Sequence, residues 1–218
     1  LIASEALADI REFFIEHQKV FGDVGFFIIN SNYTNIGSSR DANLGVRNLI
    51  VEQRPDLIER AFRGETVFVP TIRSDVPLAD ENNTGVERET EPTMFFATPV
   101  HNLKGETIAV LTQRLDPTLD FSKVLHFGRI GDTGETYVFN KTGRLMSESR
   151  FDVQLRRIGL LKPHQFSNLK IEIRDPGGNM IEGFEPKVPR SEQPLTLMAA
   201  SAVRGESGTH MKGYRNYR

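Results

Sequence analysis

The runs Phe27-Ile-Ile-Asn30 and Tyr137-Val-Phe-Asn140 decide how the rest of the sequence is interpreted. Each is an apolar run that ends in asparagine. Ten residues after that asparagine comes an arginine that directly follows a serine, Arg40 in one copy and Arg150 in the other. The copies are offset by 110 residues, and a polar turn with a glycine follows each run. This self-similarity predicts a duplicated module of helix, strand, strand, helix and further strands. The alternative is coincidence, because strand–turn–strand patterns are common.

The segments outward from the repeat predict antiparallel pairing. In three places two short runs of strand character flank a tight turn that contains glycine, which is typical of a hairpin. These hairpins join residues 93–101 to 106–115, 136–140 to 144–149, and 170–174 to 179–184. Further strands are predicted at 25–30 and 66–72, helices at 119–127 and 151–161, and a long polar loop at 74–92. Residues 43–63 also have helical spacing, and Pro55 is expected in the first turn of a second short helix that ends at Gly64.

A helix is predicted over residues 1–21, because Leu7, Ile10 and Phe14 recur at a spacing of three to four and make one apolar stripe. Hairpins rather than crossover helices join the later strands, so the sheets are expected to be antiparallel. The predicted fold class is therefore α+β, with a long N-terminal helix followed by two modules, each an antiparallel sheet flanked by helices.

The composition excludes several classes of protein. With 218 residues the chain is long enough for one large domain or two modules of about 100 residues. A net charge of −2 argues against a dedicated nucleic-acid binder, which normally shows a basic excess. The absence of cysteine removes thiol catalysis, disulfides, zinc ribbons and iron–sulfur ligation. No apolar run is long enough for a membrane span.

Both ends of the sequence resemble cut points. Leu1 lies inside a helical pattern with no N-cap residue before it, and the stretch 213–218 reads as the start of a strand. We therefore expect a fragment of a longer protein.

Catalytic motifs are absent from the sequence, which has no nucleophile elbow, zinc-binding helix motif, phosphate loop or dinucleotide fingerprint. Its five histidines never stand three or four residues apart, so we expect no metal site and no cofactor. Asp116 and Asp120 could be a hydrolytic pair, but helix capping by Asp116 or Thr118 is the more economical explanation. The chain is not expected to be an enzyme.

Ligand binding leaves a different pattern, an apolar wall with a few converging polar groups. Along the run 93–100, strand alternation puts Phe96 and Thr98 on one face and Phe95 on the other, so one of the faces can line a cavity. Arg73 and Asp75 stand where the preceding strand meets the long loop, which could close over them as a lid. The alternative is a solvated strand end. The same ambiguity holds for Arg40, Arg114 and Asp116.

The segments Gly131-Asp-Thr-Gly-Glu-Thr-Tyr-Val-Phe-Asn140 and Gly143-Arg-Leu-Met-Ser-Glu-Ser-Arg150 resemble the start and first hairpin of a membrane-proximal Cache module. Phe95-Phe-Ala-Thr-Pro-Val100 and the strand 108–116 resemble the last hairpin of a membrane-distal one. Together with the N-terminal helix and the 110-residue offset, the similarity to the double Cache domain, an extracytoplasmic sensor of transmembrane receptors, spans nearly the whole chain.

The resemblance implies a PAS-like fold in each module. It implies a signalling helix at 1–24, a membrane-distal module at 25–127 and a membrane-proximal module at 128–218 that is incomplete at its C-terminus. The full-length protein would be anchored in the inner membrane, with this portion periplasmic or extracellular. The cytoplasmic output would be a histidine kinase, a chemoreceptor signalling region or a cyclic-nucleotide enzyme. A homodimer through the N-terminal helix is also implied, and no nucleic acid.

In this family the distal module usually holds the small-molecule ligand, and Asp75 and Asp116 fall near the positions where amino-acid sensors place carboxylates. The chain departs from that pattern, since it has no tryptophan and nothing in 39–65 matches the Arg-Trp-Tyr cluster of those sensors. An α-amino acid is therefore not favoured over another small carboxylate or polar metabolite. The predicted ligand-binding residues are Arg73, Asp75, Phe96, Thr98 and Asp116. The alternative function is a structural or protein-binding ectodomain without a small-molecule ligand.

Overall fold

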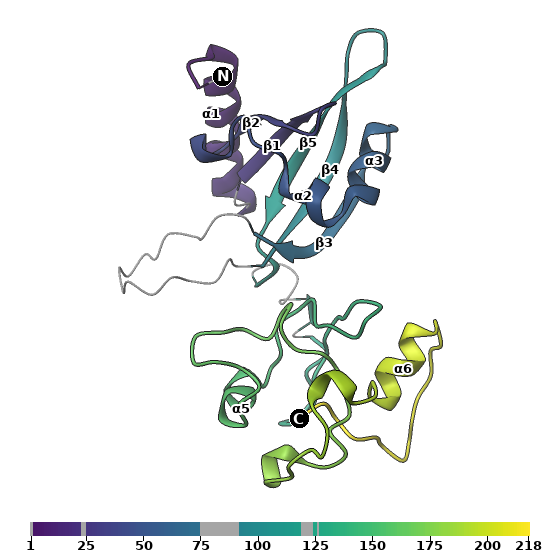
Figure 1. Cartoon of the computed structure of the whole chain (residues 1–218). Coiled ribbons are helices and arrows are strands. Elements are labelled where there is room, and N and C mark those ends of the chain that lie inside the picture. The colour runs from purple at the N-terminus through teal and green to yellow at the C-terminus, as the bar shows by residue number, and fades with distance from the viewer. Residues whose placement is uncertain (1, 23–24, 75–91, 119–123, 126) are drawn as a thin grey trace. The chain divides into compact units, whose positions relative to one another are not determined.

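A computed structural model describes residues 2–22, 25–74, 92–118, 124–125 and 127–218 (Figure 1). The chain forms two compact units, Leu1–Asp120 and Phe121–Arg218, which are called unit 1 and unit 2 below. The division into a signalling helix and two Cache modules with a boundary between residues 127 and 128 stays a prediction.

Unit 1 is built on one five-stranded antiparallel sheet with the order β2-β1-β5-β4-β3. Its first and last strands are therefore neighbours in the middle of the sheet. The predicted strands and the hairpin at residues 93–115 are confirmed. The strands are β1 (Gly25–Asn30), β2 (Asn35–Ser38), β3 (Val67–Arg73), β4 (Pro92–His101) and β5 (Thr107–Leu115).

Helices cover both faces of this sheet. The helical pattern at 43–63 forms two short helices, and the second begins at Pro55 as predicted, because Arg54 leaves helical geometry and the fixed φ of proline favours the first turn. The first of the two begins where the Asn48 side chain accepts a hydrogen bond from the Ile50 N–H at 2.8 Å. The elements are α1 (Glu5–Phe21), η1 (Asp41–Asn43), α2 (Leu49–Gln53) and α3 (Pro55–Phe62).

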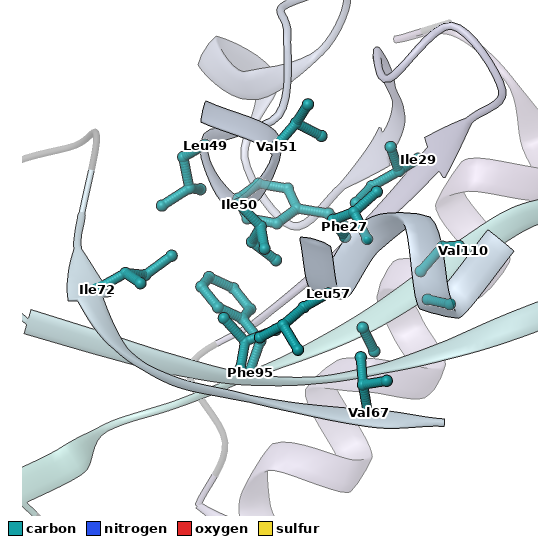
Figure 2. Close-up of a cluster of buried hydrophobic side chains, with 14 residues drawn as sticks. Phe27, Ile29, Leu49, Ile50, Val51, Leu57, Val67, Ile72, Phe95 and Val110 are labelled. Carbon is teal, nitrogen blue, oxygen red and sulfur yellow. The ribbon is translucent and has the colours of Figure 1, made fainter. Parts of the chain in front are cut away.

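The main core of unit 1 lies between the sheet and the pair α2 and α3. Phe27 and Phe95 project from neighbouring parts of the sheet, with ring centroids 5.7 Å apart, toward Ile50 and Leu57 on the helices (Figure 2). Burial of such side chains is the main stabilising contribution to the fold. The helices therefore cover the face that carries Phe95.

Helix α1 covers part of the opposite face, over β1 and β2. The Phe14 ring stacks on Phe26 with centroids 4.3 Å apart. Arg11 fixes the position of the helix, since its Nε donates to the Ser38 carbonyl at 2.8 Å and its Nη2 pairs with Asp41 at 2.7 Å. The apolar stripe predicted for this helix thus packs on its own sheet.

The asparagines that end the repeated runs form the same turn. Asn30 Oδ1 accepts hydrogen bonds from the N–H groups two and four residues later, both at 3.0 Å, and Asn140 Oδ1 does the same at 3.0 Å. The residue three positions later has a positive φ, 64° at Tyr33 and 82° at Gly143. The repeat is therefore reproduced in the hydrogen bonds of the structure.

The same turn also occurs outside the repeat. Asn102 Oδ1 accepts from the N–H groups of Lys104 and Glu106 at 2.9 and 3.0 Å, and Gly105 has a φ of 81°. Asparagine turns of this kind are set by local sequence. The shared turn therefore agrees with duplication but does not distinguish it from coincidence.

In the described part of unit 2, antiparallel pairing consists of single bridges, Phe139 to Leu145, Arg144 to Glu172 and Arg174 to Leu195. The predicted α+β class, with its N-terminal helix and antiparallel sheet, is confirmed through unit 1. The short helices of unit 2 are α5 (Asp152–Arg157), η3 (Met180–Glu182), η4 (Arg190–Glu192) and α6 (Leu197–Val203).

Two local predictions in the second half differ from the structure. The hairpin of 170–174 with 179–184 is wrong, because Asn179 accepts from the Ile181 N–H at 3.0 Å and so begins a short helix. The helix predicted at 151–161 ends early, at Arg157, and Gly159 follows with a φ of 76°. The predicted helix at 119–127 falls mostly outside the described residues.

Unit 2 has its own core, which contains a buried polar group. The Tyr217 ring is fully buried, and its hydroxyl lies 2.6 Å from Ser149 Oγ and 3.0 Å from both carboxylate oxygens of Glu135. Burial raises the pKa of Tyr217 far above its ordinary value. Glu135 of the Gly-Glu-Thr-Tyr stretch therefore has a structural partner. The apolar members are Leu145, Leu155, Leu161, Ile171, Ile173 and Ala199.

Candidate ligand site in unit 1

A charged residue lies in the core-facing row of β5. Val110, Thr112 and Arg114 alternate onto one face, and their cross-strand partners Phe27 and Phe95 belong to the core beneath α2 and α3. Only 5% of Arg114 is exposed to solvent. Taking a guanidinium out of water is unfavourable unless it is hydrogen-bonded and paired, so the contacts of Arg114 decide whether this residue is a candidate binding group.

Two buried hydroxyls orient the Arg114 guanidinium. Its Nε donates to Thr93 Oγ1 at 3.0 Å, and its Nη2 donates to Ser74 Oγ at 2.5 Å. The Arg114 Cζ atom also lies 5.7 Å from the centre of the Phe95 ring, within the range of a cation–π contact. These contacts hold a planar, permanently charged group in one orientation, which suits recognition of a carboxylate.

Helix α2 fixes the neighbouring end of β3. The Gln53 amide donates to the Arg73 carbonyl at 2.7 Å and accepts from the Arg73 N–H at 3.0 Å. This pair of bonds extends the backbone pairing of β3 with a side chain. It holds Arg73, and so the following Ser74, at the edge of the Arg114 group.

The predicted site residues separate into two groups. Arg73 ends β3 and Asp116 follows β5. Because β3 and β5 both run antiparallel to β4, they run in the same direction, and both residues lie at the same end of the sheet as Arg114. Asp116 Oδ1 accepts from the Thr118 N–H and hydroxyl, both at 2.7 Å. The helix that this turn could cap lies mostly outside the described residues, so the capping explanation stays a prediction. Asp75 lies outside the described residues.

Phe96 and Thr98 lie on the other face of the sheet from Phe95. Phe96 is 46% exposed and its ring centroid is 5.4 Å from that of Phe68, which is 41% exposed. Thr98 Oγ1 lies 2.8 Å from Thr66 Oγ1. Strand alternation correctly separates these residues from Phe95, and the structure therefore does not bring them to Arg114.

Arg114 is not among the five residues that the sequence predicts to bind the ligand. Its signal was present, because an arginine two residues after Thr112 and four after Val110 falls on the inward parity of the strand. Ser74 and Thr93 gave no signal of their own. Serine and threonine are common at solvated strand ends. Only the register of β3, β4 and β5 places these two residues beside a buried guanidinium.

A scan against protein-family models gave no match, and no curated protein matched the chain. Among solved structures, the ligand-binding domain of the Campylobacter jejuni chemoreceptor Tlp3 in complex with L-valine aligns with 70% of this chain and 56% of that domain. Its TM-score is 0.43 and its identity 10%. The same domain with isoleucine bound aligns at a TM-score of 0.43 and 9% identity. The chain thus spans little more than half the length of this chemoreceptor domain.

The alignment with the light–oxygen–voltage domain of Aureochrome1 covers 50% of this chain and 94% of that domain, at a TM-score of 0.35 and 16% identity. A sensory-box histidine kinase structure from Vibrio cholerae aligns at a TM-score of 0.30 and 17% identity, covering 52% of this chain and 94% of that one. Because the TM-scores of these matches lie below 0.5, the matches fix neither a family nor a ligand.

Within the described residues, no helix combines the length and the apolar character needed to cross a membrane.

Proposed function

We propose that unit 1 is the ligand-binding part of an extracytoplasmic sensor and that its ligand is a small metabolite with a carboxylate. The observation that carries this proposal is the buried Arg114 guanidinium, held by Thr93 and Ser74 at the end of the sheet. A fixed guanidinium can donate a hydrogen bond to each oxygen of one carboxylate, which gives geometric specificity as well as attraction. Arg73 and Asp116 lie at this end of the sheet and are proposed to complete the pocket, together with Asp75, which the sequence predicts as a ligand-binding residue.

The proposed switch follows from the position of Ser74. Its hydroxyl contacts Arg114, and the segment 75–91, which the sequence suggests as a lid, begins directly after it. A carboxylate that engages Arg114 changes the contacts of Ser74 and so biases the chain that leaves β3. A ligand can shift such an equilibrium only by its difference in affinity for the two states.

The wider context is part of the same proposal. The full-length protein is a membrane-anchored receptor with this portion outside the cytoplasm, and its output is a histidine kinase or another signalling region. A homodimer through the N-terminal helix transmits the signal. No catalytic step is proposed for either unit.

A thermal-shift screen of the 218-residue chain against carboxylates, amino acids, amines and nucleobases tests the ligand class. A ligand at 100 times its Kd stabilises the unit that binds it by about 2.7 kcal/mol. We expect carboxylates to shift the melting temperature of the wild-type chain and not of Arg114→Gln. The matched control is Arg60→Gln, which removes an exposed arginine that pairs with Glu65 in the same unit.

Thr93→Val serves as a second variant, because it keeps the charge of Arg114 and removes the acceptor of its Nε. We expect weaker carboxylate binding by Thr93→Val even if Arg114→Gln fails to fold. Equal carboxylate binding by the wild type and Thr93→Val would contradict the proposed site, as would a response to amines alone.

A protein-binding ectodomain is the second candidate, favoured by the exposed Phe68 and Phe96 rings on the side of β3 and β4 away from the core. Monomeric proteins seldom leave large apolar groups clustered at the surface without use. Under this alternative the screen shows no stabilisation by any small molecule, and Phe96→Ser leaves the melting temperature of unit 1 nearly unchanged.

A further inference from the structure

Unit 2 contains a hollow of about 310 Å³ that the proposed sensor site does not use. It lies between the turn at residues 175–178 and the segment 213–218, and it is lined by one glycine and four polar or charged residues. The lining residues are Gly178, Asn179, Arg215, Asn216 and Arg218.

Arg215 presents a guanidinium to this hollow that is only partly neutralised. Its Nε donates to both oxygens of Asp175, at 2.8 and 3.0 Å, and Asp175 also accepts from the Gly177 N–H. Among the described residues, nothing accepts a hydrogen bond from the two terminal nitrogens of Arg215. Its side chain is 61% exposed, so these nitrogens are accessible to a ligand from solvent.

Arg218 contributes a second and more rigid guanidinium. Its Cζ atom lies 3.4 Å from the centre of the Phe151 ring, and its Nη1 donates to the Gln154 side chain at 2.5 Å. Its Nε is buried and has no hydrogen-bond partner in the described structure. A stacked arginine of this kind is preorganised, so little side-chain freedom is lost when it binds an anion.

The two asparagines of the lining present donors. Asn179 Oδ1 accepts from the Ile181 N–H at 3.0 Å, and Asn216 Oδ1 accepts from the Tyr217 N–H at 2.7 Å. Because each amide oxygen is engaged by the backbone, the amide N–H₂ groups are what remains for a ligand.

A third arginine contacts the segment that lines the hollow. Arg190 Nη2 donates to the carbonyl of Tyr217, the residue between Asn216 and Arg218, at 2.9 Å. The Nε and Nη1 atoms of Arg190 are buried and without a partner in the described residues. Burial lowers the pKa of Arg190 to about 10, as expected for a cation with too little compensation.

The nearby carboxylates do not balance these cations. Asp175 is paired with Arg215, and Glu172 is shared by Arg144 at 3.1 Å and Arg174 at 2.5 Å. From the hollow, its two arginines and its amide donors, we propose that unit 2 carries a second ligand site that binds a compact oxyanion. Inorganic phosphate and small dicarboxylates share this chemistry, with several acceptor oxygens on a small body.

Isothermal titration calorimetry of the 218-residue chain tests this site, with sodium phosphate and sodium succinate as separate probes at constant ionic strength set by sodium chloride. We expect Arg215→Gln and Arg218→Gln each to raise the Kd of the probe that binds at least tenfold, about 1.4 kcal/mol. The matched control Arg204→Gln removes an exposed arginine of the same unit that pairs with Glu206 and does not line the hollow. Its Kd should equal that of the wild type.

The outcomes separate this proposal from the sensor site in unit 1. Binding that survives Arg114→Gln and is lost in Arg215→Gln places the anion in unit 2, whether or not unit 1 binds anything. The relative Kd values of phosphate and succinate then show which oxyanion the hollow prefers. The proposal is overturned if neither probe binds at millimolar concentration, or if Arg215→Gln and Arg218→Gln both bind as tightly as Arg204→Gln.

Discussion

Asn30 in unit 1 and Asn140 in unit 2 close the same turn, yet the chain around them is held together in different ways. In unit 1 the turn leads into a ladder, where β1 pairs with β2 on one side and with β5 on the other. In unit 2 the hairpin of Asn140 has a single bridge, from Phe139 to Leu145. A turn is thus fixed by a few local residues, whereas a ladder also needs partners from far along the chain.

In unit 2, arginine side chains donate hydrogen bonds to backbone carbonyls, which strand pairing does in unit 1. Arg150 Nη1 donates to the carbonyls of Gly131 and Gly134 at 2.7 and 2.8 Å, and Arg190 Nη2 donates to those of Glu172 and Tyr217. Arg156 and Arg174 each donate to one further carbonyl, at 2.7 and 2.6 Å. Backbone carbonyls removed from water need donors, and a guanidinium can serve two of them.

The largest expected effect breaks unit 1 alone. Phe95→Ala removes a fully buried ring from its core and should destabilise that unit by about 3–5 kcal/mol. Hydrogen exchange followed by mass spectrometry reads the two units separately. We expect faster exchange in β1, β4 and β5 and unchanged exchange around Leu145. Equal loss of protection in both units would mean that they unfold together.

The next effect breaks the arginine contacts of unit 2. Arg150→Met keeps most of the apolar length of the side chain but loses both carbonyl contacts, and should destabilise unit 2 by about 2–3 kcal/mol. Arg204→Met, which removes a fully exposed ion pair with Glu206, should change the stability of unit 2 far less. Urea unfolding of both variants makes the comparison. Similar midpoints for the two would show that the contacts of Arg150 with the backbone contribute little.

The shared turn predicts similar effects in both units. Asn30→Ala, Asn102→Ala and Asn140→Ala each remove an acceptor for two backbone N–H groups, so each should cost about 1 kcal/mol. Thermal unfolding of the three variants measures this. A much larger loss for Asn140→Ala than for the other two would show that unit 2, with its single bridges, depends more on its turn.

The smallest effect concerns a half-buried carboxyl in unit 2. Burial raises the pKa of Asp152 above its ordinary value of 3.8, and its Oδ1 atom is buried without a partner in the described structure. The folded state therefore keeps this proton to a higher pH than the unfolded chain does. Consequently, the free energy of unfolding falls as the pH rises from about 3.8 through the raised folded pKa.

Asp152→Asn removes this titration while it can still accept from the Ser167 N–H. We expect the variant to be slightly more stable than the wild type at pH 7 and equal to it near pH 3. Unfolding curves at several pH values give the result. A variant that is less stable at pH 7 would show that attraction to Arg156, 3.8 Å away, outweighs the burial of the charge.

Much of unit 1 could be predicted from its sequence because its elements are long and regular. The apolar stripe of α1, the alternation in β4 and the glycine turn between β4 and β5 all carry a period that one element alone determines. The repeat was also visible, but the glycine counted in each copy has a different role. Gly143 sits in the turn, whereas Gly37 lies in β2, where a Cβ atom would stand 2.9 Å from Ile28 Cδ1.

The candidate site and unit 2 could be predicted only in part. The importance of Arg114 depends on the register of three strands, and register is a property of pairs that no single segment reveals. In unit 2, Asp175 to Gly178 has the composition of a hairpin turn, but the Asn179 side chain and Gly183 start and stop a short helix. There the hydrogen bond of the Asn179 side chain starts a helix where the sequence pattern predicts the second strand of a hairpin.

The pairing of β1 with β5 has a consequence for how the protein is made. Gly25 lies opposite Arg114, so β1 waits for a partner residue that comes 89 residues later in the chain. At synthesis rates of about 5–20 residues per second, that wait lasts roughly 4–18 s. Until then the β1–β2 hairpin has an unpaired edge. Newly made chains therefore pass through a stage in which the strand 25–30 has backbone N–H and C=O groups without their final sheet partner.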